Sequence, residues 1–201
     1  LLLLAAAMLL GPALAVADHH EIKVGALLAV TGPASFLGAP EANTLEMLVD
    51  EVNAKGGIGG KKVKLIIKDT QASAEKAVSF AKQLIEEEKV LAIIGPSTSG
   101  ESMAIKALAE GAGTLLLSCA AAEVIVNPVA KQVFKTPQSD SQAVTHIFAQ
   151  MKKMGISKIG VLSSNSGFGK AGKGQIEKMA PDAGITIVAN EVYDTKATDL
   201  T

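Results

Sequence analysis

A short run of hydroxyl and glycine residues between Gly95 and Glu101 has the residue types best suited to hold a ligand. It reads Gly-Pro-Ser-Thr-Ser-Gly-Glu and connects an apolar run to an amphipathic stretch, which places it at the start of a predicted helix. Hydroxyls and free N–H groups at a helix start can hold a carboxylate or a phosphate, helped by the helix dipole. The same residues can instead serve only the helix, because Thr98 and Glu101 have the spacing of a capping box. The candidate ligand residues of this loop are Ser97, Thr98, Ser99 and Gly100.

Catalytic residues have less support in the sequence. A nucleophile elbow, G-x-S-x-G, fails at its last position, where Ser99 replaces glycine. A catalytic triad also needs a histidine, and the chain has three. We expect His19 and His20 in a solvated tail and His146 within an amphipathic helix. We therefore expect a protein that is not an enzyme, and an exported hydrolase is the alternative among enzymes.

Metal and cofactor motifs are incomplete in the same way. Residues 167–173 match G-x-x-x-x-G-K, but Gly174 stands where a P-loop carries Ser or Thr for magnesium. The glycines of residues 57–60 follow a predicted helix, whereas a dinucleotide-binding loop follows a strand. Cys119 is the single cysteine, which excludes disulfides, iron–sulfur clusters and zinc fingers. We expect no cofactor and no metal.

The overall composition narrows the class of protein. The 201 residues are 48% apolar and 19% charged, with a formal net charge of −1. Such a chain can bury a core in one domain or two small ones, so disorder is excluded. All of its basic residues apart from histidine are lysines. We expect no nucleic-acid partner, because recognition of phosphates and bases relies on clustered Arg and Lys.

The two ends of the sequence carry their own signals. Residues 1–17 are uncharged and end in Ala15-Val16-Ala17. The run is shorter than the roughly 20 residues of a membrane span and is broken by Gly11-Pro12, and a small-x-small triplet is typical of a signal-peptide cleavage site. We interpret residues 1–17 as a signal peptide without its n-region, ahead of an exported protein. The other end follows a predicted strand with no cap, which suggests a truncated chain.

From residue 22 onward, short apolar runs alternate with amphipathic stretches. Apolar strands that are each followed by a helix indicate a parallel sheet covered on both faces. A composition break at residues 137–141 separates a first lobe, 18–136, from a hinge crossover and the start of a second lobe, 137–201. Strands are predicted at 22–30, 63–67, 90–94, 114–117, 132–135, 158–163 and 186–191, and helices at 45–52, 74–89, 99–109, 143–154 and 170–179.

A ligand site is expected at one edge of this sheet. In open parallel sheets, ligands bind beyond the carboxyl ends of the strands. Those ends are predicted at 31–38, 95–100, 118–122 and 163–169. Each is rich in Gly, Ser or Ala, so backbone N–H groups can approach a ligand closely.

A series of short motifs runs through residues 22–201 in a fixed order. The motifs are IKVG at 22–25, TGP at 31–33, DEVNAKGGI at 50–58, IGP at 94–96, FKT at 134–136, SDSQ at 139–142 and GFG at 167–169. In this order they resemble the Leu/Ile/Val-type substrate-binding proteins of ABC transporters. The resemblance implies a type I periplasmic-binding fold, in which two Rossmann-like α/β lobes with parallel sheets close on a ligand about a hinge.

The resemblance also implies roles for individual residues. The loop at Ser99 would contact the carboxylate of an amino acid, and an aromatic of the second lobe, here Phe168, would pack over the ligand. Leu37 stands where the family often has an aromatic residue. The turn of Ala120, Ala121 and Ala122 would offer a backbone carbonyl to an ammonium and further contacts to the carboxylate.

These observations favour an exported, periplasmic solute-binding protein that captures a small carboxylate-bearing solute. Ala122 stands where relatives often carry Thr, and Phe168 where they carry a tyrosine-like residue. An aromatic or aliphatic acid is therefore an alternative to a branched-chain or other amino acid. The implied partner is an ABC permease in the inner membrane, and we expect a monomer. The alternative function is a ligand-sensing module of the same fold that feeds a receptor or signalling system.

Overall fold

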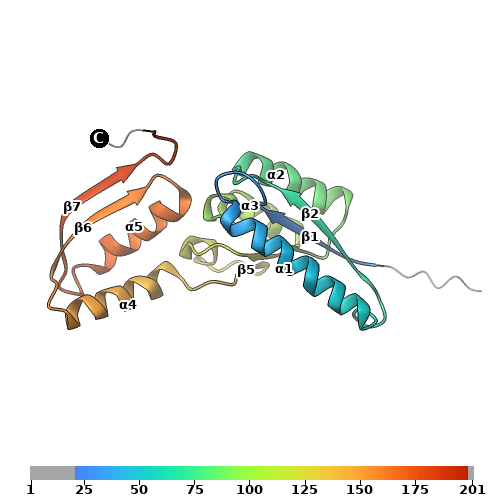
Figure 1. The fold of residues 1–201 in the computed structure, drawn as a ribbon, viewed down its shortest axis with the longest axis horizontal. Coiled ribbons are helices and arrows are strands. Elements are labelled where there is room, and N and C mark those ends of the chain that lie inside the picture. Colours follow the sequence, from blue (N-terminus) through green and yellow to red (C-terminus); the bar gives the residue numbers. More distant parts are fainter. Residues whose placement is uncertain (1–20, 199–201) are drawn as a thin grey trace, which may run out of the picture.

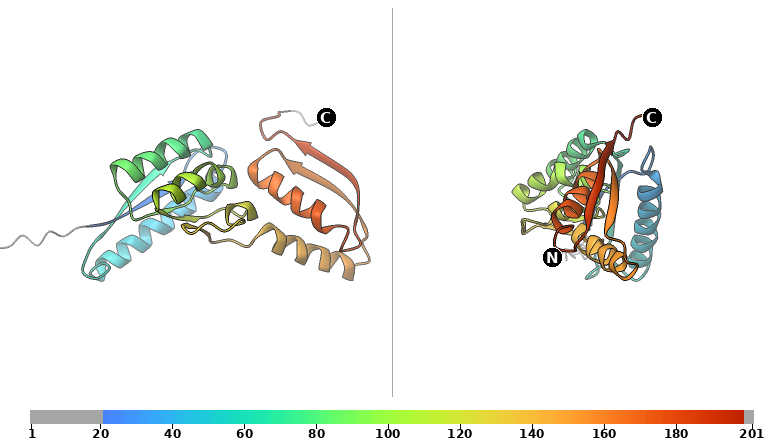
Figure 2. Two further views of the ribbon diagram at one scale, coloured as in Figure 1. Left: turned by 180° about the vertical axis from the view of Figure 1, so that it is seen from behind. Right: turned by 90° about the vertical axis from the view of Figure 1, so that its left-hand side faces the viewer.

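The chain folds into two α/β lobes, described by a computed structural model for residues 21–198. Figure 1 shows the lobes side by side, and Figure 2 shows them from behind and from one end. A short segment between β5 (Val133–Lys135) and α4 (Asp140–Lys153) leads from the first lobe to the second. The predicted α/β fold with parallel sheets in two lobes is confirmed. The predicted signal peptide, residues 1–17, lies outside the described residues.

The first lobe is built on a five-stranded sheet in the order β2-β1-β3-β4-β5. Every neighbouring pair of its strands is parallel. Its other elements are β1 (Ile22–Leu28), α1 (Ser35–Ala54), β2 (Val63–Asp69), α2 (Ala74–Lys82) with the π-helical turn Gln83–Glu87, β3 (Ala92–Ile94), α3 (Ser99–Ala112), β4 (Leu115–Ser118) and the 3-10 turn Glu123–Ile125.

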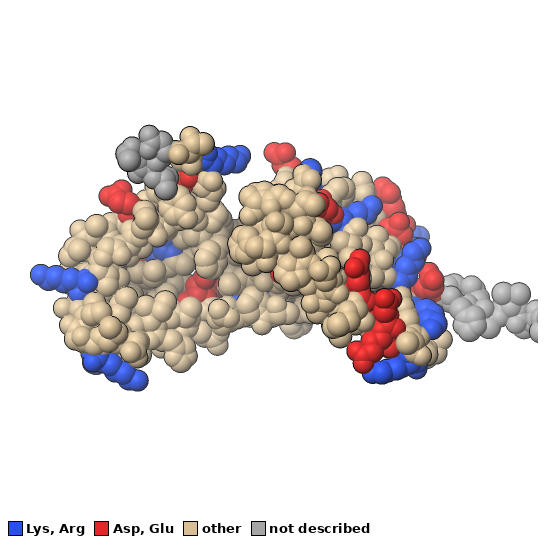
Figure 3. All heavy atoms as spheres, viewed as in Figure 1, with Lys and Arg blue, Asp and Glu red and all other residues tan. Residues whose placement is uncertain are grey.

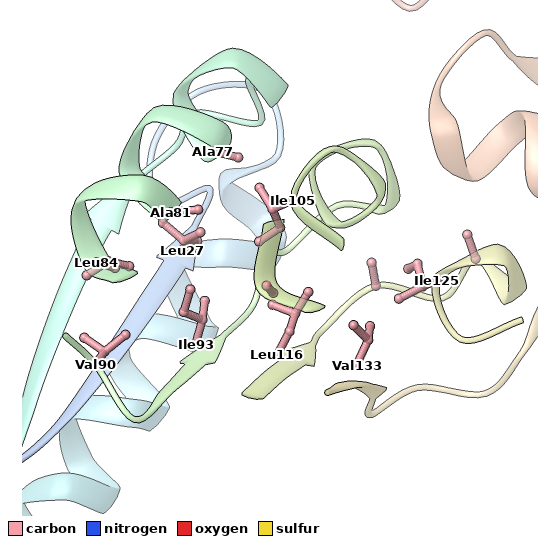
Figure 4. Packing of buried hydrophobic residues seen from close by; sticks show 13 residues of the cluster. Leu27, Ala77, Ala81, Leu84, Val90, Ile93, Ile105, Leu116, Ile125 and Val133 are labelled. Carbon is pink, nitrogen blue, oxygen red and sulfur yellow. The ribbon is translucent and has the colours of Figure 1, made fainter. Parts of the chain in front are cut away.

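Strand β1, which lies between β2 and β3, separates two apolar layers. Leu27 faces the cluster made with α2 and α3, which Figure 4 shows packed against one face of the sheet. Ala26 and Leu28 face α1 on the other side, where Ala42 packs against them. This alternation follows the two-residue period of a strand. Each fully buried Leu or Ile of these layers contributes about 1.5–3 kcal/mol to stability.

The second lobe holds β6 (Lys158–Ser164), α5 (Gly167–Met179) and β7 (Thr186–Tyr193) in addition to α4. β6 and β7 pair in parallel. Val144 and Phe148 of α4 form its core with Ile185, and Ile176 of α5 packs against them. On the strands, Leu162 and Val188 are exposed. The prediction that helices cover both faces of the sheet therefore holds for the first lobe. In the described residues of the second lobe, apolar side chains of the strands are exposed to solvent.

Several helix boundaries differ from the sequence prediction. α1 begins at Ser35, ten residues before the predicted start at 45. Its buried residues are Gly38 and Ala42, so the face that packs on the sheet is made of small residues, which a search for large apolar side chains overlooks. α2 changes into a π-helical turn at Gln83. In the described part of the chain, no helix is both long and apolar enough to cross a bilayer.

Candidate ligand-binding site

The candidate site lies at the carboxyl ends of the first lobe's strands, where the chain leaves β3 and β4. Gly95 follows β3 with φ = +92°, and a Cβ there would lie 2.2 Å from the Leu27 carbonyl oxygen. Only glycine fits this position, because a side chain would both clash and be strained by the left-handed φ. The turn carries the serine-rich loop across the end of β1 and into α3.

Ser99 is the first residue of α3 and is 2% exposed. Its Oγ accepts a hydrogen bond of 3.3 Å from the backbone N–H of Ala122, in the turn after β4. The loop after β3 and the turn after β4 are thereby joined. The hydroxyl proton of Ser99 stays available for a further acceptor, because Ser99 acts as the acceptor in this bond.

The neighbouring hydroxyls hold the loop in place. Ser97 Oγ accepts from the N–H of Ala29 at 3.1 Å and donates to a carboxylate oxygen of Glu41 on α1. Thr98 is the N-cap of α3, but its hydroxyl donates to the Glu101 carboxylate at 2.5 Å. The predicted capping box of Thr98 and Glu101 is therefore wrong in its chemistry, since the two side chains bond each other and Thr98 accepts no backbone N–H.

The alanine turn after β4 is anchored from two directions. Ala120 N–H donates to Ser118 Oγ at 3.1 Å. Lys135 Nζ donates to the Ala121 carbonyl at 2.9 Å and also to the carbonyls of Pro137 and Gln138 at 3.0 and 2.9 Å. Lys135 thus ties the candidate ligand turn to the segment that leads into the second lobe. Sequence reasoning gave this lysine only a place in a motif, because its partners are backbone carbonyls.

Two carboxylates lie near the loop, of which the sequence analysis gave Glu101 a capping role and missed Glu41. Glu101 is 1% exposed, and among the described residues its Oε1 has no hydrogen-bond partner. Burial raises the pKa of Glu41, and the nearby charge of Glu101 raises it further, against the lowering effect of the Ser97 hydroxyl. Burial and the charge of Glu41 raise the pKa of the Cys119 thiol to about 11. A raised pKa leaves little of the Cys119 thiol as thiolate at neutral pH, which makes it a weaker nucleophile.

The two apolar candidates lie in helices where loops were expected. Leu37, 38% exposed, is in the first turn of α1, and Phe168, 58% exposed, is in the first turn of α5. The predicted loops 31–38 and 163–169 are wrong in these parts. Ser166 caps α5 by accepting from Gly169 N–H at 3.1 Å. This cap makes the glycine-rich stretch the first turns of a helix, which is a further reason against a P-loop, where the glycines form the loop before the helix.

Other surfaces offer less to a polar solute. A hollow of about 390 Å³ in the second lobe, between α4 and β6, is lined by apolar residues such as Val144, Phe148 and Val161. In Figure 3, many charged side chains gather at the outer ends of the molecule, and the face between the lobes is mostly uncharged.

Within residues 21–198, no group of His, Cys, Asp and Glu is arranged to hold a metal ion. His146 is exposed on α4, away from the serines of the loop.

Comparison with known proteins places the chain in a family. Residues 21–201 match the family described as periplasmic binding protein. The chain belongs to this family. A Leu/Ile/Val-binding protein homolog 7 of Brucella suis is 30% identical over 205 residues, which cover 97% of this chain and 50% of the relative. The resemblance to Leu/Ile/Val-type binding proteins is thereby confirmed.

Solved structures of periplasmic binding proteins share the fold. An extracellular ligand-binding receptor from Rhodopseudomonas palustris has a TM-score of 0.82 at 30% identity, over 90% of this chain and 49% of that one. The branched-chain amino acid transporter substrate binding protein of Streptococcus pneumoniae, in complex with isoleucine, has a TM-score of 0.77 at 27% identity, over 90% and 52%. The chain spans about half the length of the relatives it matches.

Proposed function

We propose that this periplasmic binding protein captures a small carboxylate-bearing solute between its two lobes and delivers it to an ABC permease. The family is one of solute-binding proteins, and the related protein of Streptococcus pneumoniae binds isoleucine. The proposed location is the periplasm, as the family description and the sequence of residues 1–17 both suggest. The protein acts by binding alone and catalyses no reaction.

The observation that carries the proposal is the bond between Ser99 and Ala122. It brings two strand ends together and leaves one hydroxyl proton at the start of a helix, where the dipole favours a negative group. The N–H of Gly100 lies in the same first turn of α3. A carboxylate would accept from both donors, and a bond of this charged kind is about twice as strong as a neutral one.

The alanine turn supplies carbonyl oxygens, which accept hydrogen bonds. The carbonyl of Ala121 accepts from Lys135, and that of Ala122 accepts from the N–H of Ile125 at 3.2 Å. Among the described residues, the Ala120 carbonyl is the one of the three without such a donor. It would receive the ammonium of an amino acid. An aromatic or aliphatic acid has no ammonium to donate to this carbonyl. Comparing the affinity for an amino acid with that for the same acid without its amino group therefore shows whether the Ala120 carbonyl takes part in binding.

The test is a binding titration of the full-length protein with L-isoleucine, with its desamino analogue 3-methylpentanoate and with benzoate. Ser99→Ala should weaken binding of the preferred acid by about tenfold or more, because a hydrogen bond to a charged group is lost. It should also lower the stability of the ligand-free protein by about 1 kcal/mol, since Ala122 N–H loses its acceptor.

Ser97→Ala is the matched control for this test. It also removes an acceptor from a backbone N–H, that of Ala29, and in addition the donor to Glu41, so its stability cost should be at least as large. Its affinity should equal that of the wild type, because Ser97 already donates to Glu41. Equal affinity losses in the two variants would mean that Ser99 acts only as a structural residue, and the proposal would fail.

Sensing is a second candidate, because the similar Rhodopseudomonas palustris structure is described as a ligand-binding receptor. Deletion of the gene separates the two functions. Loss of uptake of the radiolabelled solute in the deletion strain supports delivery to a permease. Normal uptake with loss of a transcriptional or chemotactic response to the same solute supports sensing.

A further inference from the structure

The two lobes contact each other where α5 begins. A Cβ added at Gly167 would lie 2.8 Å from the backbone N of Gly100 and 2.9 Å from its Cα. It would also lie 2.9 Å from Cε of Met103, one turn along α3. One turn along α5, Ala171 packs against the apolar cluster of the first lobe. Figures 1 and 2 show the corresponding ends of α3 and α5 side by side.

Space, and not backbone conformation, explains the glycine at this position. Gly167 is the first residue of α5 and does not have a left-handed φ, so other residues could adopt its backbone angles. Their side chains would not fit, because a real Cβ essentially never lies closer than 3.0 Å to a backbone atom. By contrast, a Cβ at Gly100 or Gly174 would meet nothing within 4 Å.

We propose that Gly167 is a positioning residue for ligand binding, and that its missing side chain sets how closely the second lobe seats on the ligand loop of the first. This inference rests on the proposed binding function. The backbone N of Gly100, next to Ser99 in the ligand loop, is the first-lobe atom nearest to a Cβ built at position 167. Any residue larger than glycine would act as a wedge at the edge of the candidate site and hold the lobes apart there. Ala171 supplies the second point of the same contact.

A side chain at position 167 would lower the affinity for the solute by preventing the two lobes from closing on it. A solute held between two lobes gains contacts from both only when the lobes meet, and an open form loses those of the second lobe. Phe168 follows Gly167 directly, so a shift of the start of α5 also shifts this side chain. The fold of each lobe is unaffected, because the added methyl group points at the other lobe and not into either core.

The experiment compares Gly167→Ala with Gly174→Ala in the full-length protein. Both put alanine into α5, and position 174 lies two turns further along the same helix face, where there is free space. L-isoleucine and benzoate are the probes for affinity. Hydrogen–deuterium exchange of the amides at the start of α3, in ligand-free protein, reports whether the lobes still meet.

Gly167→Ala should bind the probe about tenfold or more weakly, as expected for overpacking of a tight contact. Its α3 amides should exchange faster, with an unchanged melting temperature. Gly174→Ala should match the wild type in all three measurements. Ala171→Leu is an independent wedge at the second contact point and should reproduce the effect if Gly167→Ala fails to fold.

Exchange at α3 that is the same in Gly167→Ala and the wild type would overturn the inference, whatever the affinity. Affinity that is the same in both would overturn it as well. If the wild type binds neither probe but the wedge variants still expose α3, the contact is real and the choice of solute fails. The two failures are thus distinguishable.

Discussion

At the scale of single residues, the serine loop divides its tasks between neighbours. Ser97 joins β1 to α1, Thr98 bonds Glu101, and Ser99 joins the loop to Ala122 while keeping its proton. Each of the three adjacent hydroxyl residues thus has a different set of partners. The division follows from the turn at Gly95, which directs successive side chains to different elements.

Glu41 offers a prediction at this scale. Burial raises the pKa of Glu41 in the folded protein above its value in the unfolded chain, so ionisation of Glu41 lowers the stability of the fold. The folded protein is favoured while Glu41 is protonated, and this stability is lost as the pH rises through the pKa of Glu41 in the folded protein. Glu41→Gln keeps an acceptor for Ser97 and removes the titration. Urea unfolding at pH 4, 5.5 and 7 should show the variant gaining stability over the wild type as pH rises. Glu46→Gln, on an exposed part of the same helix, controls for the loss of one charge, and an equal gain there would refute the explanation.

At the scale of elements, close packing of helix on strand places the loop. α1 rests on the end of β1 through Gly38, where a Cβ would lie 2.3 Å from the Ala29 carbonyl. Ala29 in turn donates to Ser97, so α1, β1 and the loop after β3 meet at one residue. Lys135 plays the same part on the other side, between the alanine turn and the segment to α4.

Gly38→Ala should therefore destabilise the protein by about 1–3 kcal/mol, because α1 must move off β1. The matched variant is Gly111→Ala in α3, where a Cβ meets nothing within 4 Å. It should stabilise by about 0.5–1 kcal/mol, since alanine is the better helix former. Chemical denaturation measures both. A stabilising Gly38→Ala would show that α1 is not seated on Ala29 as described.

At the scale of the whole molecule, the lobes have separate cores and few contacts with each other. The apolar clusters of the first lobe draw on α1, α2 and α3, and that of the second on α4 and α5. Ala171 and Gly167 connect them on one side, and hydrogen bonds of Glu123 with Asp140 and Ser141 connect them at the start of α4. Two cores with so small a joint contact can unfold separately, which departs from two-state behaviour.

Calorimetry of the full-length protein tests this arrangement. Without ligand we expect two transitions, one for each lobe. A solute at 100 times its Kd adds about 2.7 kcal/mol to the form that binds it and, by contacting both lobes, should merge the transitions. A single two-state transition in ligand-free protein would show that the lobes are already coupled.

Much of this protein follows from local sequence patterns. Short apolar runs predicted all seven strands, and the glycine and hydroxyl residues at 95–101 predicted a loop at the carboxyl edge of the sheet. Such signals are readable because strand period, helix caps and turn residues depend on neighbours in the chain. The ordered motifs added the family, which the comparisons confirmed.

Other features were decided only by tertiary structure. The start of α1 depends on the fit of Gly38 against Ala29, and the division of roles between Ser97 and Ser99 depends on partners 68 and 23 residues away. The lack of space for a side chain at Gly167 depends on the other lobe. Glu41 gave no signal in the sequence, and Glu101 gave only that of a helix cap, because a carboxylate in an amphipathic helix is usually solvated. Contacts between distant segments arise from packing in three dimensions, and no local pattern encodes them.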